Sequence, residues 1–283
     1  MDGFINFNKQ KNFTSHDAVN LVRKIFQTKK VGHAGTLDPA ATGVLPIAVG
    51  RATKFIEYLA DCDKTYRAEI FFGLETSTGD LEGEIIFQEE NFFMPTFSEL
   101  QNATKNFLGE IEQTPPKYSA IKISGRKAYD LARKNVDFEM PKRLVKINRF
   151  EILRVEENFL TAEIDCAKGT YIRSLAGDFG ESLKLPATLK SLQRLRVGKF
   201  FLNDSVTLDD LKVAPEKFLH PIENCLEFEK FNLPLHRVKA FLSGLSTTVD
   251  LPNKIVKVYA NEKFLGIGKV LDGELYSEKL ACI

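Results

Sequence analysis

The sequence predicts an α+β protein, with a mixed or antiparallel sheet in a large domain and a small β-rich domain at the C-terminal end. Helical and strand patterns are mixed without the regular β-α-β period of a doubly wound sheet. The chain has 283 residues, 43% of them hydrophobic and 27% charged, which suits one large and one small globular unit. After about residue 228 the pattern changes to short strands. We therefore expect one domain over residues 1–230 and another over residues 231–283.

Periodicity and turn residues predict the elements of the first half. Thr14 and Ser15, followed by Asp17, start an amphipathic helix over residues 15–27. Residues 32–43 are rich in glycine and turn formers and lie between apolar segments, so we expect an ordered loop with a function. The other elements expected here are strands at 44–49, 66–72 and 84–88, a helix at 52–59, and a helix from the capping box at 96–99 to Gly109.

The second half is expected to be rich in strands. Its predicted elements are a strand at 118–123, a helix at 127–134, a strand pair at 145–155 and 159–166, and a helix from about 170 to 183. In the tail, strands are expected at 255–259 and 263–270, followed by a turn at 272–273. These short strands make the tail a small all-β unit.

Several classes of protein are excluded by what the sequence lacks. The longest apolar stretch, residues 44–49, is far shorter than the ~20 residues of a membrane helix, and the N-terminus lacks a secretory signal. We therefore expect a cytoplasmic protein with no membrane partner. The four cysteines and four histidines form no C-x-x-C or H-x-x-x-H pair, so neither a metal site nor a disulfide framework is expected.

Opposite charges occupy different stretches of the chain, although the net charge is only +1. Residues 80–112 are mostly acidic, residues 117–154 are mostly basic, and residues 184–199 carry basic side chains and no acid. This segregation suits a face that follows nucleic-acid phosphates, and it equally suits separate solvated helix faces.

Asp38 is the residue most suggestive of chemistry. It lies in the glycine-bounded loop and precedes Pro39, so its carboxylate is held in place and remains accessible. Such a carboxylate suits a nucleophile or a base, whereas the alternative is an Asp-Pro pair that only starts a turn. The chain contains no nucleophile-elbow serine, Walker loop, H-E-x-x-H motif or Rossmann glycine pattern.

Five sequence blocks, taken in order, resemble those of the TruB-type tRNA pseudouridine synthases. They are GHAGTLDPAATGVLP at 32–46, KTYR at 64–67, TGD with a following glycine at 78–83, PPKYSAIK at 115–122 and KGTYIR at 168–173. The family converts uridine 55 in the T loop of tRNA to pseudouridine. The resemblance implies a pseudouridine synthase catalytic domain followed by a PUA-like RNA-binding domain. It also implies tRNA, through its T-arm stem-loop, as the partner, and we expect the protein to act as a monomer.

The resemblance implies catalytic roles for three residues. Asp38 would attack the uridine covalently, after which the glycosidic bond breaks, the base rotates and a carbon–carbon bond forms without a metal or a cofactor. Arg173 would be the ion-pair partner that keeps Asp38 charged, because an adjacent cation favours the charged form. Tyr66 would stack on the target base, and its hydroxyl would take part in proton transfer.

Three further residues are implied to act on the flipped-out nucleotide. Tyr171 and Leu192 would contact this nucleotide, and His33 would stack to cap the gap that it leaves. Without the resemblance, Leu192 would be interpreted as a core residue and His33 as an ordinary loop histidine.

The chain departs from the family pattern at several positions. Gln10 and Asn12 replace a proline and a glycine in a turn near the N-terminus, Ala167 replaces a serine, and Gln193 replaces an arginine. The first difference concerns the geometry of the turn, and the last removes one possible phosphate contact. Two other functions stay open. One is a noncatalytic protein that binds or folds tRNA on the same scaffold, and the other is a glycosidase, for which no second acid lies near Asp38 in the sequence.

Overall fold

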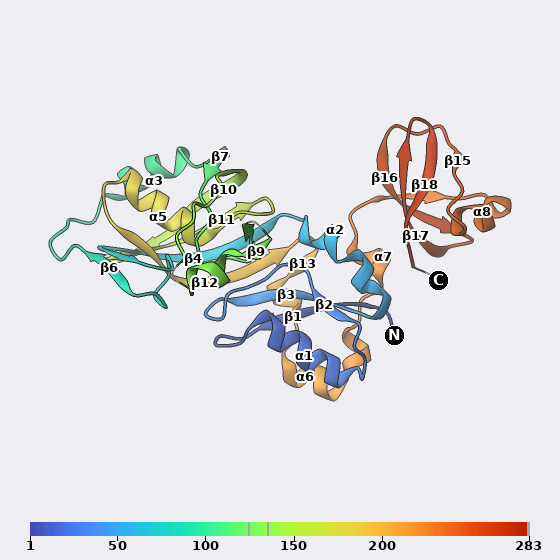
Figure 1. The fold of residues 1–283 in the computed structure, drawn as a ribbon, viewed down its shortest axis with the longest axis horizontal. Coiled ribbons are helices and arrows are strands. Elements are labelled where there is room, and N and C mark those ends of the chain that lie inside the picture. The colour runs from blue at the N-terminus through green and yellow to red at the C-terminus, as the bar shows by residue number, and fades with distance from the viewer. Residues whose placement is uncertain (124, 135, 282–283) are drawn as a thin grey trace.

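The computed structural model describes residues 1–123, 125–134 and 136–281, and its two main sheets differ in size (Figure 1). The larger sheet has nine strands and the smaller sheet, at the C-terminal end, has five. Helices pack against the larger sheet, which confirms the predicted α+β class. Within the described residues, no helix is long and apolar enough to span a membrane.

The larger sheet is mixed, as predicted. Its strands are β1 (Gly3–Lys9), β2 (Val31–His33), β3 (Thr42–Val49), β4 (Lys64–Phe72), β7 (Gly109–Gln113), β10 (Arg143–Val155), β11 (Phe159–Cys166), β12 (Ala187–Val197) and β13 (Phe200–Phe201). They run in the order β1-β3-β12-β4-β11-β10-β7, with β2 beside β3 and β13 beside β12. The pairing of β12 with β3 is parallel, whereas β12 is antiparallel to β4 on its other side. β12 therefore joins β1, β2 and β3 to the rest of the sheet.

The two helices predicted from capping residues begin where the sequence places them. In α1 (Ser15–Ile25), Thr14 and Asp17 exchange side-chain and backbone hydrogen bonds, and Thr96 and Glu99 do the same at the start of α3 (Phe97–Lys105). Residues 52–59 form a 3₁₀ turn, η1 (Gly50–Phe55), that continues into a short α-helix. The remaining α-helices are α2 (Ile56–Ala60), α4 (Ala128–Ala132), α5 (Ile172–Ser182), α6 (Leu208–Val213), α7 (Ile222–Cys225) and α8 (Val238–Leu242).

The strand expected at 118–123 is wrong. Only its last two residues pair, as β8 (Lys122–Ile123) with β9 (Arg126–Lys127) in a short hairpin before α4. The Ser119 and Ile121 carbonyls accept from the first amides of α4 and cannot join a sheet ladder. A second small hairpin, β5 (Leu74–Thr76) with β6 (Ile85–Gln88), includes the strand predicted at 84–88.

One face of β4, β10 and β11 is covered by α3 and α5 (Figure 1). Phe179 of α5 lies at the centre of an aromatic cluster, with its ring centroid 5.1 Å from that of Phe150 and 6.2 Å from that of Phe72. All three side chains are buried, and such packing contributes beyond the area removed from water. This core fixes α5 on the sheet, and α5 carries Arg173 near its first turn.

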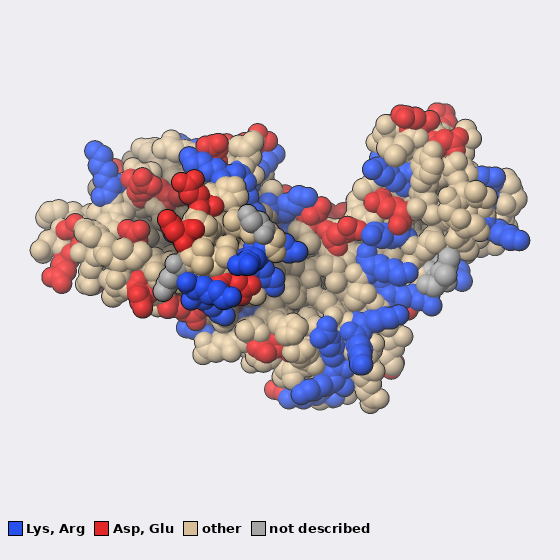
Figure 2. Space-filling model, in the orientation of Figure 1, with Lys and Arg blue, Asp and Glu red and all other residues tan. Residues whose placement is uncertain are grey.

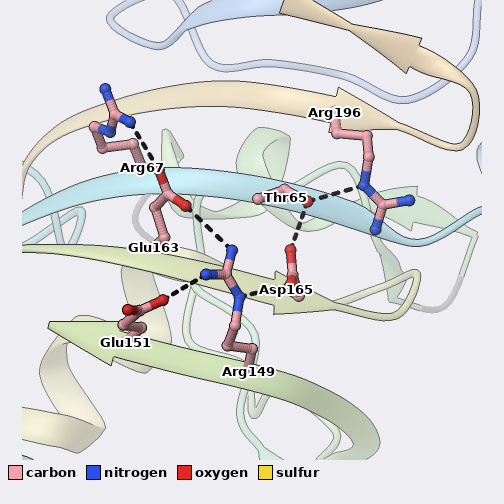
Figure 3. Close-up of polar contacts among 7 residues, drawn as sticks. All are labelled: Thr65, Arg67, Arg149, Glu151, Glu163, Asp165 and Arg196. Carbon is pink, nitrogen blue, oxygen red and sulfur yellow. Dashed lines mark hydrogen bonds and ion pairs between the residues drawn. The ribbon is translucent and has the colours of Figure 1, made fainter. Parts of the chain in front are cut away.

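The opposite face of the same strands carries a charged network (Figure 3). Arg149 donates to Glu151, Glu163 and Asp165. Glu163 also accepts from Arg67, and the hydrogen bonds from Arg67 and then Arg149 hold the pKa of Glu163 below its usual value. The charged side chains of this network therefore link β4, β10 and β11.

Removing a carboxylate of this network should weaken the fold in a pH-dependent way. Because the pKa of Glu163 is lower in the folded state, its contribution is present above the unfolded pKa of about 4.3 and is lost as the pH falls through the folded value. We expect Glu163→Gln to lower the melting temperature at pH 7 by about 2–4 °C. Thermal melts at pH 7 and pH 3 should show this difference shrinking in acid. The matched control is Glu157→Gln, in the exposed turn after β10, which should change neither melt. A difference that persists unchanged at pH 3 would mean that the charge of Glu163 is not its cause.

The smaller sheet packs against the N-terminal part of the chain. Its strands, in the order β14-β16-β17-β18-β15, are β14 (Glu229–Asn232), β15 (Thr247–Thr248), β16 (Lys254–Ala260), β17 (Lys263–Leu271) and β18 (Glu274–Leu280). Phe264 on β17 and Phe55 on η1 lie 6.2 Å apart, measured between ring centroids, and belong to one buried cluster. The division at residue 230 and the PUA-like character of the tail stay predictions.

Candidate active site

The loop that carries Asp38 connects β2 to β3 and is held at both ends by Arg194 of β12. Arg194 is 1% exposed, and its guanidinium donates to the Gly35 carbonyl at 3.0 Å and to the Val44 carbonyl at 2.7 Å. Gly43, with a φ of +100°, lies against the same strand, where a Cβ would come within 2.2 Å of the Arg194 carbonyl oxygen. Only glycine fits there, and its small size lets the start of β3 lie in close contact with β12.

The N-terminal turn that departs from the family pattern also supports this loop. Asn12 has a φ of +61°, a left-handed conformation that asparagine tolerates better than most residues. The backbone amide of Asn12 donates to the Pro39 carbonyl at 2.9 Å. Lys9 is fully buried, and its Nζ donates to the carbonyls of Pro39 and Phe13, while burial lowers its pKa to about 8. Asn12 thus supplies the turn for which the family uses glycine.

Asp38 forms an ion pair with Arg173, with 3.0 Å between Oδ2 and Nε. Arg173 is 7% exposed, and its two Nη groups donate to the carbonyls of Thr78 and Tyr118, at 3.0 and 2.9 Å. The guanidinium is therefore fixed from behind, and its Nε remains for the carboxylate.

Asp80 is a second carboxylate at this arginine, with its Oδ2 3.7 Å from the Arg173 Nε. The Thr78 hydroxyl donates to Asp80 and orients it. Burial raises the pKa of Asp38, and the negative charge of Asp80 raises it further, while the Arg173 cation opposes both. The ionised state of Asp38 therefore depends on Arg173.

These groups line a cavity of about 580 Å³. Of the residues predicted for the site, those that line it are Asp38, Tyr66, Tyr171, Arg173 and Leu192. Tyr66 is 7% exposed, and burial raises the pKa of its hydroxyl, which is therefore protonated at neutral pH. The cavity thus combines a carboxylate that can attack, a cation that keeps it charged and aromatic rings on which a planar ligand can stack.

His33 is not among the residues that line this cavity. It is the last residue of β2, its Nδ1 is buried with no hydrogen-bond partner among the described residues, and burial lowers its pKa. The imidazole is therefore neutral at pH 7. Its capping role stays a prediction.

Two residues at the site were missed by sequence reasoning. Asp80 lies in the TGD block at 78–80, which the sequence shows but to which it assigns no role, and the fold brings this acid to Asp38. Both carboxylates lie near the Nε of one arginine, and this cation opposes protonation of Asp38, whereas a glycosidase needs one acid protonated. Arg194 is the other: in the sequence it is one basic residue in the run at 184–199, and nothing there shows that it is buried.

That basic run does not form one surface. Arg194 is internal, Lys190 pairs with Glu69, and Arg196 donates to the Thr65 hydroxyl. Glu69 and Thr65 point to the face of β4 opposite Tyr66, because successive side chains of a strand alternate. Lys190 and Arg196 are therefore held by partners on β4, away from the cavity, and the expectation that residues 184–199 follow RNA phosphates stays a prediction.

Among the residues that the structure describes, no group of three or more His, Cys, Asp or Glu side chains is placed to hold a metal ion. Asp38, Asp80 and Glu82 line the cavity, but the first two face a cation. The expectation of a reaction without metal or cofactor stays a prediction.

Comparisons with known proteins find similarity to pseudouridine synthases, and the matches to individual proteins cover nearly the whole chain. The model of the TruB family pseudouridylate synthase N-terminal domain matches residues 23–172. The tRNA pseudouridine synthase B of Clostridium tetani is 39% identical over 277 residues, which cover 95% of this chain and 96% of that protein. The enzyme of the same name from a Nostoc species is 42% identical over 285 residues, 97% of each chain.

Two solved structures have the same fold. A chain from the crystal structure of a Cbf5-Nop10-Gar1 complex has a TM-score of 0.78 at 25% identity, over 98% of this chain and 84% of that chain. A chain from an H/ACA RNP bound to a substrate RNA containing 2′-deoxyuridine has a TM-score of 0.76 at 23% identity, with the same coverage.

Proposed function

The chain belongs to the TruB family of pseudouridylate synthases, and we propose that it converts uridine 55 in the T loop of tRNA to pseudouridine with Asp38 as the nucleophile. The observation that carries this proposal is the ion pair between Asp38 and Arg173 in the cavity. Relatives named tRNA pseudouridine synthase B, similar from end to end, support tRNA as the substrate.

The reaction is an isomerisation that needs no oxidant, reductant or group donor. The uridine leaves its base stack and enters the cavity, where the Asp38 carboxylate attacks it covalently. The bond from the ribose C1′ to N1 breaks, the base rotates, and C1′ forms a bond to C5. The covalent bond between Asp38 and the nucleotide then breaks, which restores the carboxylate. A proton leaves C5 and a proton is gained at N1, so the atoms balance within one nucleotide.

The remaining residues of the cavity hold the base during its rotation. The Tyr66 ring stacks on the base, and its protonated hydroxyl takes part in proton transfer. Tyr171, which immediately precedes α5, and Leu192 of β12 contact the extruded nucleotide. The neutral His33 stacks into the gap in the T loop, for which an uncharged ring suffices.

The T-arm stem-loop is the part of tRNA that must reach the cavity, and one copy of the chain contains every group assigned here. We therefore propose a monomeric enzyme that acts on the T arm in the cytoplasm, where tRNA is processed.

An unmodified T-arm hairpin tests this function. Incubation with the protein should convert uridine 55 to pseudouridine, detected by nucleoside analysis, whereas a hairpin with cytidine at that position should stay unchanged. Binding without product would instead support a noncatalytic tRNA-binding protein. Release of free uracil would support a glycosidase.

RNA binding should weaken steeply with salt through the basic segment beside the cavity. Figure 2 shows Lys and Arg side chains gathered around β9, and Arg126 and Lys127 there are exposed, while Arg133 lines the cavity. Charge-removing changes at Arg126 and Lys127 should flatten the slope of log affinity against log salt by up to about one unit for each phosphate that the side chains neutralise. Filter binding at several salt concentrations measures this slope. Lys190→Gln, on the opposite face, is the control and should leave it unchanged. If Lys190→Gln flattens the slope as much as the changes at Arg126 and Lys127 do, the RNA does not follow this segment.

Arg194→Met should impair the enzyme from inside the protein. The change leaves buried carbonyl oxygens without a donor, at a cost of about 1–3 kcal/mol each, and frees the Asp38 loop. We expect the free energy of unfolding to fall by about 2–4 kcal/mol and the single-turnover rate by about tenfold or more. Denaturant unfolding and rapid-quench kinetics measure the two effects. The salt slope of RNA binding should not change, and a decrease of one unit would show that Arg194 contacts a phosphate.

A further inference from the structure

The edge of the larger sheet reaches the cavity through two residues that face each other across β7 and β10. Gln113, the last residue of β7, is the register partner of Arg143, the first residue of β10. Both side chains contact Tyr171, which immediately precedes α5 and lines the cavity. Neither residue contributes to the ion pair of Asp38.

Gln113 holds the main chain of Tyr171. Gln113 is only 1% exposed. Its Oε1 accepts from the backbone amide of Tyr171 at 2.8 Å, and its Nε2 donates to the Tyr171 carbonyl at 3.0 Å. A carboxamide can satisfy a donor and an acceptor at once, as a neighbouring strand does. Tyr171 caps the helix with a backbone outside the helical region, so this clamp sets where α5 begins and where Arg173 follows.

Arg143 holds the ring of Tyr171. Its guanidinium carbon lies 4.6 Å from the ring centroid, in the geometry of a cation–π contact. Its Nε and Nη2 are buried without a hydrogen-bond partner, and no ion pair joins it to an acid in the described part of the chain. A cation without an acid partner is thus kept against one ring.

We propose that Gln113 and Arg143 are positioning residues that together fix Tyr171 for the extruded uridine. Gln113 sets the main chain and Arg143 sets the plane of the ring, so the target nucleotide meets an already ordered surface. The proposal rests on the proposed function. The competing role for Arg143 is a direct contact with an RNA phosphate through its Nη1.

A double-mutant cycle separates positioning from phosphate binding. Arg143→Lys, Arg143→Met, Tyr171→Ala and the double variant Arg143→Met with Tyr171→Ala are compared with the parent on the unmodified T-arm hairpin. We expect both Arg143 variants to lower the single-turnover rate at saturating RNA by about ten- to a hundredfold, with Kd and its salt slope within twofold of the parent. In the Tyr171→Ala background, Arg143→Met should cost nothing further. Arg154→Met, at the exposed far end of β10, is the matched control and should change neither quantity.

Gln113→Glu provides an independent arm because it keeps the size and the acceptor but loses the donor to Tyr171. It should lower the saturated rate while circular dichroism and the melting curve remain those of a folded protein. The inference is overturned if the saturated rates of folded Arg143 and Gln113 variants equal that of the parent. A phosphate contact of Arg143 would give three different results. Arg143→Lys would restore the rate, the effects of Arg143→Met and Tyr171→Ala would add, and Arg143→Met would lower the salt slope by about one unit. These results together would overturn the inference for Arg143. A parent that forms no pseudouridine would instead refute the proposed function itself.

Discussion

Asp38→Asn is expected to abolish pseudouridine formation while leaving tRNA binding within about threefold of the parent. The substitution keeps the size of the side chain but removes the charge with which it attacks, so the covalent step has no nucleophile. We expect the single-turnover rate to fall by about 10⁴-fold or more, and gel-shift titration to give a nearly unchanged Kd. Product formation is measured by nucleoside analysis of the hairpin at times long enough for the parent to finish many turnovers.

The control for this variant is Asp209→Asn on α6, an exposed carboxylate paired with Lys212. It should retain the parent's rate and affinity. If Asp38→Asn keeps full activity, another group is the nucleophile. If it loses binding as well, the carboxylate supports the site and the loss of rate does not identify its chemistry.

Arg173→Met should cripple the same reaction through the charge of Asp38. Burial and Asp80 already raise the pKa of Asp38, and Arg173 is the main group that opposes them. Without the arginine the carboxyl binds its proton at higher pH, so the acid limb of the kcat/KM profile should move upward by about one unit or more. We expect a loss of about a hundredfold at pH 7 that is partly recovered at higher pH. A pH–rate profile of the folded variant measures this shift.

Two further variants test the same electrostatic account. Arg173→Lys keeps a positive charge but cannot hold the Thr78 and Tyr118 carbonyls together, so its acid limb should move less than that of the Met variant. Asp80→Asn removes a charge that raises the pKa of Asp38, and its acid limb should move to lower pH. If the acid limb stays in place in the Met variant, Arg173 does not set the protonation of Asp38.

The parts of the fold that follow local rules could be predicted from the sequence. The starts of α1 and α3 and the pair β10 and β11 are predicted correctly, because capping residues mark the helices and the two strands are long. β12 was missed since register shifts at Leu189/Ser191 and Arg194/Arg196 break the alternation of its side chains. β1 was missed since it is buried over nearly its whole length, including the polar Asn6 and Lys9.

The site divides in the same way. Asp38, Tyr66 and Arg173 stand in contiguous motifs, which makes them recognisable from the amino-acid sequence alone. The roles of Asp80 and Arg194 depend on contacts across the chain, and a fully buried arginine is rare enough that a basic run suggests a solvated surface. Likewise, the strand pattern of the tail does not show that Phe264 packs against Phe55 in one buried cluster.

The central place of β12 has a consequence for biosynthesis. Arg194 bonds to carbonyls 150 and 159 residues earlier in the chain, and β12 fills the position between β3 and β4. During translation the Asp38 loop emerges long before the strand that holds it, so the nascent polypeptide contains the nucleophile without its scaffold. Closing so long a loop is entropically costly and slow, and it places assembly of the catalytic centre among the last steps of folding. A ribosome-bound chain that stops before Ala187 therefore carries Asp38 but has no catalytic centre.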